Sequence, residues 1–276
     1  MRVVRIRLLN YNLVFMAEKQ VFLITGGSSG IGLSCILKLS EDKNNQVISF
    51  SRSGEKIKRA LKEMGEKPSN VEFLNGDVSN EKDCDWLVVY LDKHFGKLHG
   101  LVNGAGVITK GGIEMISYDQ WKYNLDVNLN GPYLLTRKLL PLLKKSLGAS
   151  VVNISSVAAM RPGTSVAYSV SKAGLDMLTE FLAGDLAPYK IRVNSVNPGL
   201  VKTNIHLDNQ IFKTEKAYEE MTEKAKERYP LERIGTSEEV ADLILYLLSP
   251  KASWITGSIF KIDGGSLIFN ELLPPK

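Results

Sequence analysis

The sequence has 276 residues and a formal net charge of +5, with 44% hydrophobic and 24% charged residues. This balance is typical of a globular protein and excludes a disordered, collagen-like or disulfide-stapled chain. Lysines and glutamates are interspersed, so no nucleic-acid partner is expected. The two cysteines, Cys35 and Cys84, lie far apart with no histidine pattern near them, which predicts a reducing, cytoplasmic environment and no metal site.

Residues 1–15 contain three arginines and no acid. We expect this stretch to be a disordered overhang from an upstream start, because Met16 offers a start directly before the first strand; the alternative is a mitochondrial targeting segment. No apolar run approaches the ~18–20 residues that a membrane span needs, so no membrane partner is expected. Residues 16–276 contain no linker-like tract and are expected to form one domain.

Short apolar runs alternate with stretches of helical periodicity along the rest of the chain. The runs predicted as strands are 21–25, 46–50, 71–74, 100–103, 150–155, 191–196 and 258–262. The stretches predicted as helices are 31–40, 55–64, 81–95, 118–145, 167–187 and 237–248. Continuous apolar strands separated by helices indicate a parallel sheet covered on both faces. The predicted fold class is therefore α/β, a single-domain Rossmann-like doubly wound sheet.

The first predicted strand runs directly into a glycine-rich turn, T-G-G-S-S-G-I-G at 25–32, and then into a helix. Glycines allow the backbone to turn tightly and to approach a pyrophosphate, which the amides of a helix N-terminus stabilise. The spacing is one residue longer than the dinucleotide fingerprint, so the strand before it and the helix after it carry the interpretation. We expect a dinucleotide to bind at Gly26, Ser28, Ser29, Gly30, Ile31 and Gly32.

The second predicted strand is followed by Ser51 and Arg52, where an NAD-selective fold places an acid against the ribose 2′-hydroxyl. No acid stands there, and an arginine can hold a 2′-phosphate through charge-assisted hydrogen bonds. This favours NADP as the cofactor. The alternative is NAD, with Arg52 an ordinary solvated loop residue.

Tyr168 and Lys172 are four residues apart in Y-S-V-S-K, so they share one face of the helix predicted over 167–187. An ammonium group beside a phenol lowers the pKa of the phenol and makes it a candidate general acid/base. Taken alone, this spacing is typical of an ordinary amphipathic helix. Its significance depends on the motifs around it.

Together the motifs resemble those of the short-chain dehydrogenase/reductase family, over residues 21–265. In chain order they are T-G-G-S-S-G-I-G at 25–32, D-V at 77–78, N-G-A-G at 103–106, Asn128, N-I-S-S at 153–156, Y-S-V-S-K at 168–172, N-P-G-L-V-K-T at 197–203 and I-D-G-G at 262–265. The resemblance implies an oxidoreductase that moves a hydride between a nicotinamide cofactor and a carbonyl or secondary alcohol substrate. It also implies a homodimer or homotetramer, with the helices that begin near Tyr118 and Ala167 packing against symmetry mates.

The resemblance also implies a role for each site residue. Tyr168 would exchange a proton with the substrate oxygen, and Lys172 would lower the pKa of that phenol and bind the nicotinamide ribose. Ser156 would hold the substrate oxygen, and Asn128 would anchor a water that links Lys172 to solvent. The remaining cofactor contacts would be Asp77, Val78, Asn103, Gly104, Ala105, Gly106, Pro198, Gly199, Val201 and Thr203.

Two features depart from the family's pattern. Gly104 replaces the usual second asparagine, and we expect little effect. The usual spacing between the serine and the tyrosine would select Ser155, whereas alignment of the strand V-V-N-I-S-S selects Ser156. We choose Ser156, because a loop loses a residue more easily than a buried strand changes register.

The substrate pocket is expected to be mostly apolar, which favours a moderately hydrophobic ketone over a highly charged substrate. Its expected lining is Ile108, Met160, Pro162, Leu200 and Ile205. Residues 204–230 resemble an insertion, and apolar residues recur there at helical spacing and form a stripe. The stripe predicts a helix packed on its own core, a mobile lid over the substrate, or both.

Two other functions stay open. One is an NAD-dependent dehydrogenase of a sugar, polyol or steroid-like alcohol. The other is a non-catalytic dinucleotide-binding sensor or scaffold, which has no need of Asn128, Ser156, Tyr168 and Lys172 together.

Overall fold

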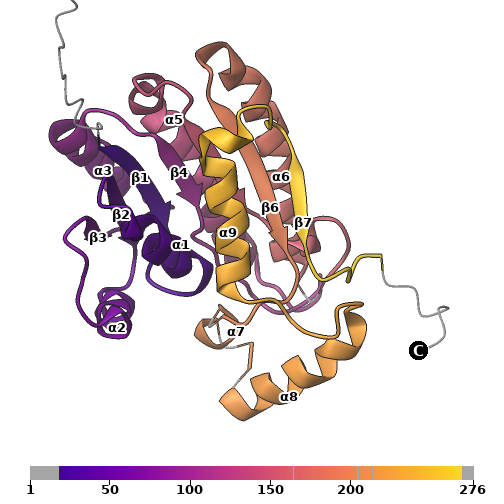
Figure 1. The fold of residues 1–276 in the computed structure, drawn as a ribbon. Coiled ribbons are helices and arrows are strands. Elements are labelled where there is room, and N and C mark those ends of the chain that lie inside the picture. Colours follow the sequence, from indigo (N-terminus) through magenta and orange to yellow (C-terminus); the bar gives the residue numbers. More distant parts are fainter. Residues whose placement is uncertain (1–18, 164, 204, 210, 213, 269–276) are drawn as a thin grey trace, which may run out of the picture.

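A parallel sheet forms the centre of the molecule (Figure 1). The computed structural model describes residues 19–268 except 164, 204, 210 and 213, and in this part of the chain seven strands lie in the order β3-β2-β1-β4-β5-β6-β7. The strands are β1 (Gln20–Thr25), β2 (Asn45–Ser51), β3 (Val71–Asn75), β4 (Gly100–Asn103), β5 (Ser150–Ile154), β6 (Arg192–Pro198) and β7 (Ile259–Ile262). This confirms the predicted doubly wound fold. The expected overhang, 1–15, lies outside the described residues.

Helices cover both faces of the sheet (Figure 1). One face packs against α1 (Gly30–Glu41) and α9 (Ser237–Leu248), and the other against α3 (Glu81–Phe95), α5 (Gly131–Lys144) and α6 (Val166–Leu186). The remaining α-helices are α2 (Gly54–Met64), α4 (Tyr118–Leu125), α7 (Ile205–Asp208) and α8 (Glu215–Ala225). The last two stand at one end of the sheet, below α9 in Figure 1.

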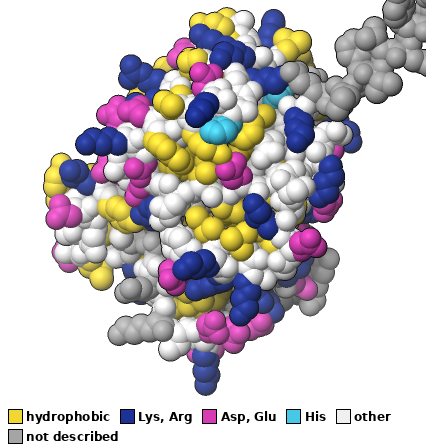
Figure 2. All heavy atoms as spheres, turned by 90° about the vertical axis from the view of Figure 1, so that its left-hand side faces the viewer, with side chains coloured by type: hydrophobic (Ala, Val, Ile, Leu, Met, Phe, Trp, Pro, Cys, Tyr) yellow, Lys and Arg dark blue, Asp and Glu magenta, His cyan; other side chains and the backbone are white. Residues whose placement is uncertain are grey.

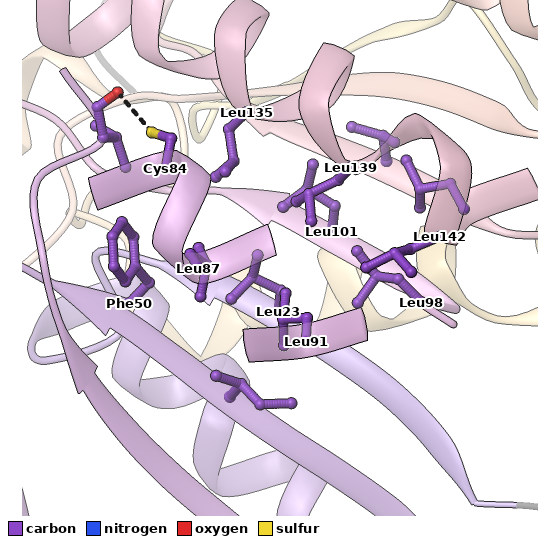
Figure 3. Close-up of a cluster of buried hydrophobic side chains, with 14 of the residues drawn as sticks. Leu23, Phe50, Cys84, Leu87, Leu91, Leu98, Leu101, Leu135, Leu139 and Leu142 are labelled. Carbon is purple, nitrogen blue, oxygen red and sulfur yellow. Dashed lines mark hydrogen bonds between the residues drawn. The ribbon is translucent and has the colours of Figure 1, made fainter. Parts of the chain in front are cut away.

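Leucines dominate the larger of the two apolar cores, between the sheet and α3 and α5 (Figure 3). Leu23 and Leu101, from neighbouring strands, meet Leu87 of α3 and Leu139 of α5, and none of the four is exposed. The thiol of Cys84 lies in the same core, 3.4 Å from the Val78 carbonyl oxygen. Burial on both faces explains why the strands are continuously apolar in sequence.

The helix predicted over 118–145 is divided in the structure. A π-helical turn, η1 (Asp126–Asn130), separates α4 from α5. Inside it the Asn128 side chain donates to the Val107 carbonyl oxygen at 2.9 Å and accepts from the Val107 amide at 2.9 Å. The apolar period runs through the turn without a break, so the sequence pattern could not reveal it. Such turns are frequent at functional sites.

Charged side chains of both signs are distributed over the surface shown in Figure 2. On the face of α2 and α3, positive and negative side chains are interspersed among apolar ones (Figure 2). No helix in the described part of the chain is long and apolar enough to cross a membrane.

The strand order reverses between β1 and β4, which are hydrogen-bonded neighbours although β2 and β3 come between them in sequence. The connections that follow β1 and β4 therefore turn to opposite sides of the sheet. Doubly wound sheets bind ligands in the crevice outside the carboxyl ends of the strands at such a point.

Candidate active site

Glycines of the turn after β1 are packed too closely to be replaced by residues with a side chain. A Cβ on Gly32 would lie 2.5 Å from the Gly26 carbonyl oxygen, and one on Gly26, where φ is +71°, would lie 2.7 Å from the Gly104 carbonyl oxygen. A Cβ on Gly104 would in turn lie 2.8 Å from the Thr25 carbonyl oxygen. Close packing therefore explains why glycine stands at position 104 in this chain. The comparison with the family's usual asparagine did not suggest this.

A cavity of about 980 Å³ runs from this turn to the end of β5. All the residues predicted to bind the cofactor line it except Asp77 and Asn103, and Ser156 lines it as well. The glycine cradle and the size of the cavity fit a dinucleotide with a small substrate beside it.

The side chains of Asn103 and Asp77, the two expected cofactor contacts that do not line the cavity, have partners within the fold. The Asn103 amide is buried and donates to Asn153 Oδ1 at 2.8 Å, so it ties β4 to β5. The Asp77 carboxylate accepts from the amide and the hydroxyl of Ser79, at 2.8 and 2.7 Å. Asp77 Oδ2 also lies 3.7 Å from Arg52 Nη1 at the edge of the cavity.

Met160, expected in the substrate pocket, does not line the cavity either. It ends the short 3₁₀ turn η2 (Val157–Ala159), where its amide donates to the Val157 carbonyl oxygen at 3.1 Å. This turn leaves the Met160 side chain 42% exposed. The other expected pocket residues, Ile108, Pro162, Leu200 and Ile205, do line the cavity.

Ser156, Tyr168 and Lys172 meet at one end of the cavity. The Ser156 hydroxyl lies close enough to the Tyr168 phenol to lower its pKa. Lys172 Nζ lies 5.7 Å from the centre of the Tyr168 ring and donates to the Ile154 carbonyl oxygen at 2.7 Å. A helix beginning at Val166 and a strand ending at Ile154 therefore bring together residues that are 16 positions apart in sequence.

The pKa of Tyr168 does not follow the prediction. Burial raises it above the ordinary value for a phenol, and the Ser156 hydroxyl acts in the opposite direction. Burial also lowers the pKa of Lys172 to about 8, against the attraction of the Asp176 carboxylate. The prediction considered the ammonium group and neglected desolvation, which disfavours both charged forms.

Ser155 and Ser156 point to different partners. The Ser155 hydroxyl is buried and donates to the Lys172 main-chain oxygen at 3.1 Å. The Ser156 hydroxyl accepts from the Ala158 amide at 3.1 Å and faces Tyr168. Of the two serines, Ser156 is therefore the one whose hydroxyl acts on the Tyr168 phenol.

Behind these residues lies a polar network that the sequence did not suggest. Asn197 Nδ2 donates to Asp176 Oδ2 at 2.7 Å and to the Ser156 carbonyl oxygen at 3.0 Å. Ser195 Oγ donates to Asp176 Oδ1 at 2.9 Å. Asp176 is one helical turn beyond Lys172, so its carboxylate faces Lys172. The network therefore joins β6, the main chain of Ser156 and this carboxylate.

Comparison with known proteins agrees with this geometry. A family model described as enoyl-(acyl carrier protein) reductase matches residues 26–266. The chain belongs to the short-chain dehydrogenase/reductase family. It is an oxidoreductase of the NAD(P)-dependent kind, and the resemblance drawn from its motifs is confirmed.

Several dehydrogenases and reductases of this family are similar over nearly their full length. L-xylulose reductase of Caenorhabditis elegans is 38% identical over 88% of this chain and 94% of that protein. Glucose 1-dehydrogenase 2 of Bacillus subtilis is 33% identical over 91% of this chain and 96% of that protein. The ligand-free structure of Thermoplasma acidophilum aldohexose dehydrogenase has a TM-score of 0.82 at 30% identity, covering 94% of this chain and 98% of that one.

The cavity of about 980 Å³ is also lined by charged residues that the sequence did not suggest. Lys56 of α2 pairs with Asp208 of α7 at 2.6 Å, which joins the two rims of the cavity. Arg161 and Arg228 line it as well. None of these stands in a family motif, and they converge only through tertiary contacts between distant loops.

The segment 204–230 contains the helix that its stripe predicted, α8. Tyr218 of α8 is 6% exposed and stacks on the His206 ring at 5.8 Å, so the segment has its own small apolar cluster. His206, Asp208 and Arg228 line the cavity from this side.

Proposed function

We propose that this chain transfers a hydride between NADP(H) and a carbonyl or secondary alcohol carbon, with Tyr168 as the general acid/base. The observation that carries the proposal is the shared cavity, which has the glycine turn and Arg52 toward one end and Ser156, Tyr168 and Lys172 at the other. The bound cofactor supplies the hydride. The protein supplies the placement and the proton.

In this proposal Ser156 holds the substrate oxygen by a hydrogen bond and Tyr168 exchanges a proton with that oxygen. The Lys172 ammonium group stabilises the phenolate that proton donation leaves, and in the family's pattern it also binds the nicotinamide ribose. Because burial raises the pKa of Tyr168, the phenol is protonated at neutral pH in the free protein. The protonated phenol is the form that donates a proton to the substrate oxygen in carbonyl reduction.

Asn128 belongs to the same proposal as a positioning residue. Both Nδ2 hydrogens of its side chain are used inside the fold, by the Val107 carbonyl oxygen and by the Ser171 hydroxyl at 3.0 Å, and its Oδ1 accepts from the Val107 amide. A Cβ on Gly106 would lie 3.6 Å from Asn128 Oδ1 and 4.0 Å from Lys172 Nζ, so both polar groups border this glycine. That proximity supports a role in a water path to Lys172.

Ser156→Ala is expected to lower kcat/KM for carbonyl reduction by about 10–100-fold, because a hydrogen bond to the reacting oxygen is lost. Ser155→Ala, which removes a hydrogen bond to main chain, should cost less than about threefold in kcat/KM and show its effect in the melting temperature. Steady-state kinetics of the two variants make the comparison. A larger loss for Ser155→Ala would assign the substrate contact to Ser155.

The rate should fall at alkaline pH. With a pKa of about 8, Lys172 loses its charge as the pH rises through that value, and kcat/KM then falls by about tenfold per pH unit. Asp176→Asn removes the carboxylate that raises this pKa, so the fall should begin at lower pH. Ser195→Ala keeps the carboxylate and should leave the position of the fall unchanged. Equal profiles for wild type and Asp176→Asn would contradict the role of Lys172.

The preference for NADP rests on the residues around the end of β2. Arg52 follows β2 with its side chain 40% exposed. Its Nη1 donates to the Tyr123 phenol and lies 3.7 Å from the Asp77 carboxylate, and the guanidinium keeps further N–H donors for a 2′-phosphate. Ser51 and Lys56 line the same part of the cavity.

Arg52→Asp is expected to lower the ratio of kcat/KM with NADPH to that with NADH by about 100-fold, because a charge-assisted contact becomes a repulsion. Lys58→Asp, which makes the same charge change on the exposed side of α2, should leave the ratio within about threefold. Initial rates with both cofactors measure it. A wild type that prefers NADH, unaltered in Arg52→Asp, would refute NADP selectivity.

A second candidate is an NAD-linked dehydrogenase of a sugar, polyol or steroid-like alcohol. The names of three relatives favour a sugar as its substrate. A screen of aldoses, ketoses, polyols and apolar ketones with both cofactors separates the two candidates.

Exposed apolar side chains on α6, Val170, Met177 and Phe181, support the expected homodimer or homotetramer. Cytoplasmic location and closure of 204–230 as a lid belong to the same proposal.

A further inference from the structure

The charges around the cavity do not balance. Among the described residues that line it, Asp208 is the one carboxylate, against five permanently or readily charged cations: Arg52, Lys56, Arg161, Lys172 and Arg228. A cavity lined mainly by one sign of charge concentrates ligands of the opposite sign. A cation that already has a partner in the fold is less available to such a ligand.

Three of the five are already engaged. Lys56 forms its ion pair with Asp208 at 2.6 Å. Lys172 is buried and donates to the Ile154 carbonyl oxygen, and the Asp176 carboxylate faces it from the next turn of α6. Arg52 lies near Asp77 and is on the cofactor side of the cavity, at the end of β2.

The other two, Arg161 and Arg228, come from different loops. Arg161 follows η2, five residues after Ser156, and Arg228 ends η4 (Lys226–Arg228), directly after α8. Both side chains are exposed at the rim. Neither has a carboxylate partner within the part of the chain that the structure describes, which contrasts with Arg52 and Lys56.

Tyr229 lines the same cavity as Arg161 and Arg228. The Tyr229 phenol accepts from the Leu200 amide at 2.9 Å. Burial raises the pKa of Tyr229, and the charges of Arg161 and Arg228 both act against that rise, so both lie within electrostatic reach of one oxygen. The carboxylate that also acts on this phenol, Asp263, accepts from the Ser266 hydroxyl at 3.0 Å and from main-chain amides.

Two like charges on the wall of one cavity repel each other, and an anion bound between them lowers that repulsion. Guanidinium groups suit this task because each can donate two parallel hydrogen bonds to a carboxylate or a phosphate. Resting on the proposed function, we propose that Arg161 and Arg228 bind an anionic group at one end of a substrate whose carbonyl lies against Ser156 and Tyr168.

The lining between the two ends refines the substrate class. Pro162, Leu200 and Ile205 are apolar and line the same cavity. The substrate is then a carbonyl compound with a short apolar stretch and a terminal carboxylate or phosphate, such as a keto acid. This substrate class differs from the expected moderately hydrophobic ketone, an expectation that was based on the apolar residues alone.

Calorimetry with unreactive probes tests the site without any turnover. Hexanoate and hexanamide have nearly the same shape and differ in charge, and hexyl phosphate replaces the carboxylate with a phosphate. With wild-type protein, in the presence and absence of NADP⁺, the proposal expects hexanoate or hexyl phosphate to bind at least about tenfold more tightly than hexanamide. The tighter of the two anions identifies the source of the charge, and added salt should weaken it.

Variants assign the binding to the two arginines. Arg161→Gln and Arg228→Gln should each lower anion affinity by about tenfold and leave hexanamide unaffected, because both side chains are exposed and their loss should not disturb folding. Lys224→Gln removes a nearby exposed charge of α8 that does not line this cavity, and it should change nothing. Equal affinity for acid and amide, no binding of either anion, or a charge preference that survives both substitutions together would overturn the proposal.

The proposed function can fail separately. If the anions bind as expected but no carbonyl compound is reduced in a Tyr168-dependent way, the hydride-transfer proposal is wrong and the anion site stands. If carbonyl compounds are reduced and the acid shows no advantage over the amide in binding, the anion site is wrong and the reductase stands.

Discussion

Tyr168→Phe is expected to lower kcat for carbonyl reduction by about 10²–10⁴-fold, the usual contribution of a positioned general acid. The substitution removes one oxygen atom from a side chain that already lies among Ser156 and the cavity wall, so the ring and its packing remain. Cofactor affinity should change by less than about threefold. Absorbance of the reduced nicotinamide follows the rate, and fluorescence titration of NADPH follows the binding.

Tyr133→Phe is the matched control, because Tyr133 of α5 is 45% exposed and does not line the cavity. It should retain full activity. A Tyr168→Phe variant that reduces its substrate within about threefold of the wild-type rate would exclude the phenol as proton donor, and the neighbouring Ser156 hydroxyl or a water would have to take that role.

Gly32→Ala should damage both stability and cofactor binding. The added methyl group would lie 2.5 Å from the Gly26 carbonyl oxygen, and main chain cannot yield as a flexible side chain can. Overpacking of this kind costs about 1–3 kcal/mol of unfolding free energy. The turn must open to relieve it, so the amides that would face the pyrophosphate move apart, and we expect NADP⁺ affinity to fall by about 100-fold.

Gly184→Ala provides the control within the same protein. Gly184 lies in α6, and an added methyl group there would meet no neighbouring side chain or other element within 4 Å, so alanine should raise the unfolding free energy by up to about 1 kcal/mol. Thermal unfolding and NADP⁺ titration measure both variants. Unchanged cofactor affinity in a folded Gly32→Ala protein would contradict the account of the turn.

The fold could be predicted from the sequence because each element satisfies a local rule. The β1 run is apolar and is buried from Val21 onward, and α9 begins where a capping residue and acids of the first turn are placed, at Thr236 and Glu239. The helix over 118–145 could not be predicted correctly. Its π turn depends on the hydrogen bonds of Asn128 with Val107, two residues that are 21 positions apart.

The site was predictable to the extent that it depends on motifs. Ser156, Tyr168 and Lys172 do meet, because β5 and α6 are neighbours in this fold. The direction in which the pKa of Tyr168 shifts was not predictable, because the desolvation of a side chain depends on how deeply the fold buries it. The same holds for Arg161 and Arg228, which line one cavity although they are 67 positions apart and stand in no shared motif.

Transfer of deuterium from the cofactor tests the central claim most directly. NADPH labelled with deuterium at position 4 of the nicotinamide, on either face, is incubated with wild-type protein and the best carbonyl compound from the screen. The account predicts that one of the two labelled cofactors delivers one deuterium to the former carbonyl carbon, seen as a gain of about one mass unit in the alcohol. An alcohol without label from either cofactor, or no alcohol from any carbonyl tested, would contradict it.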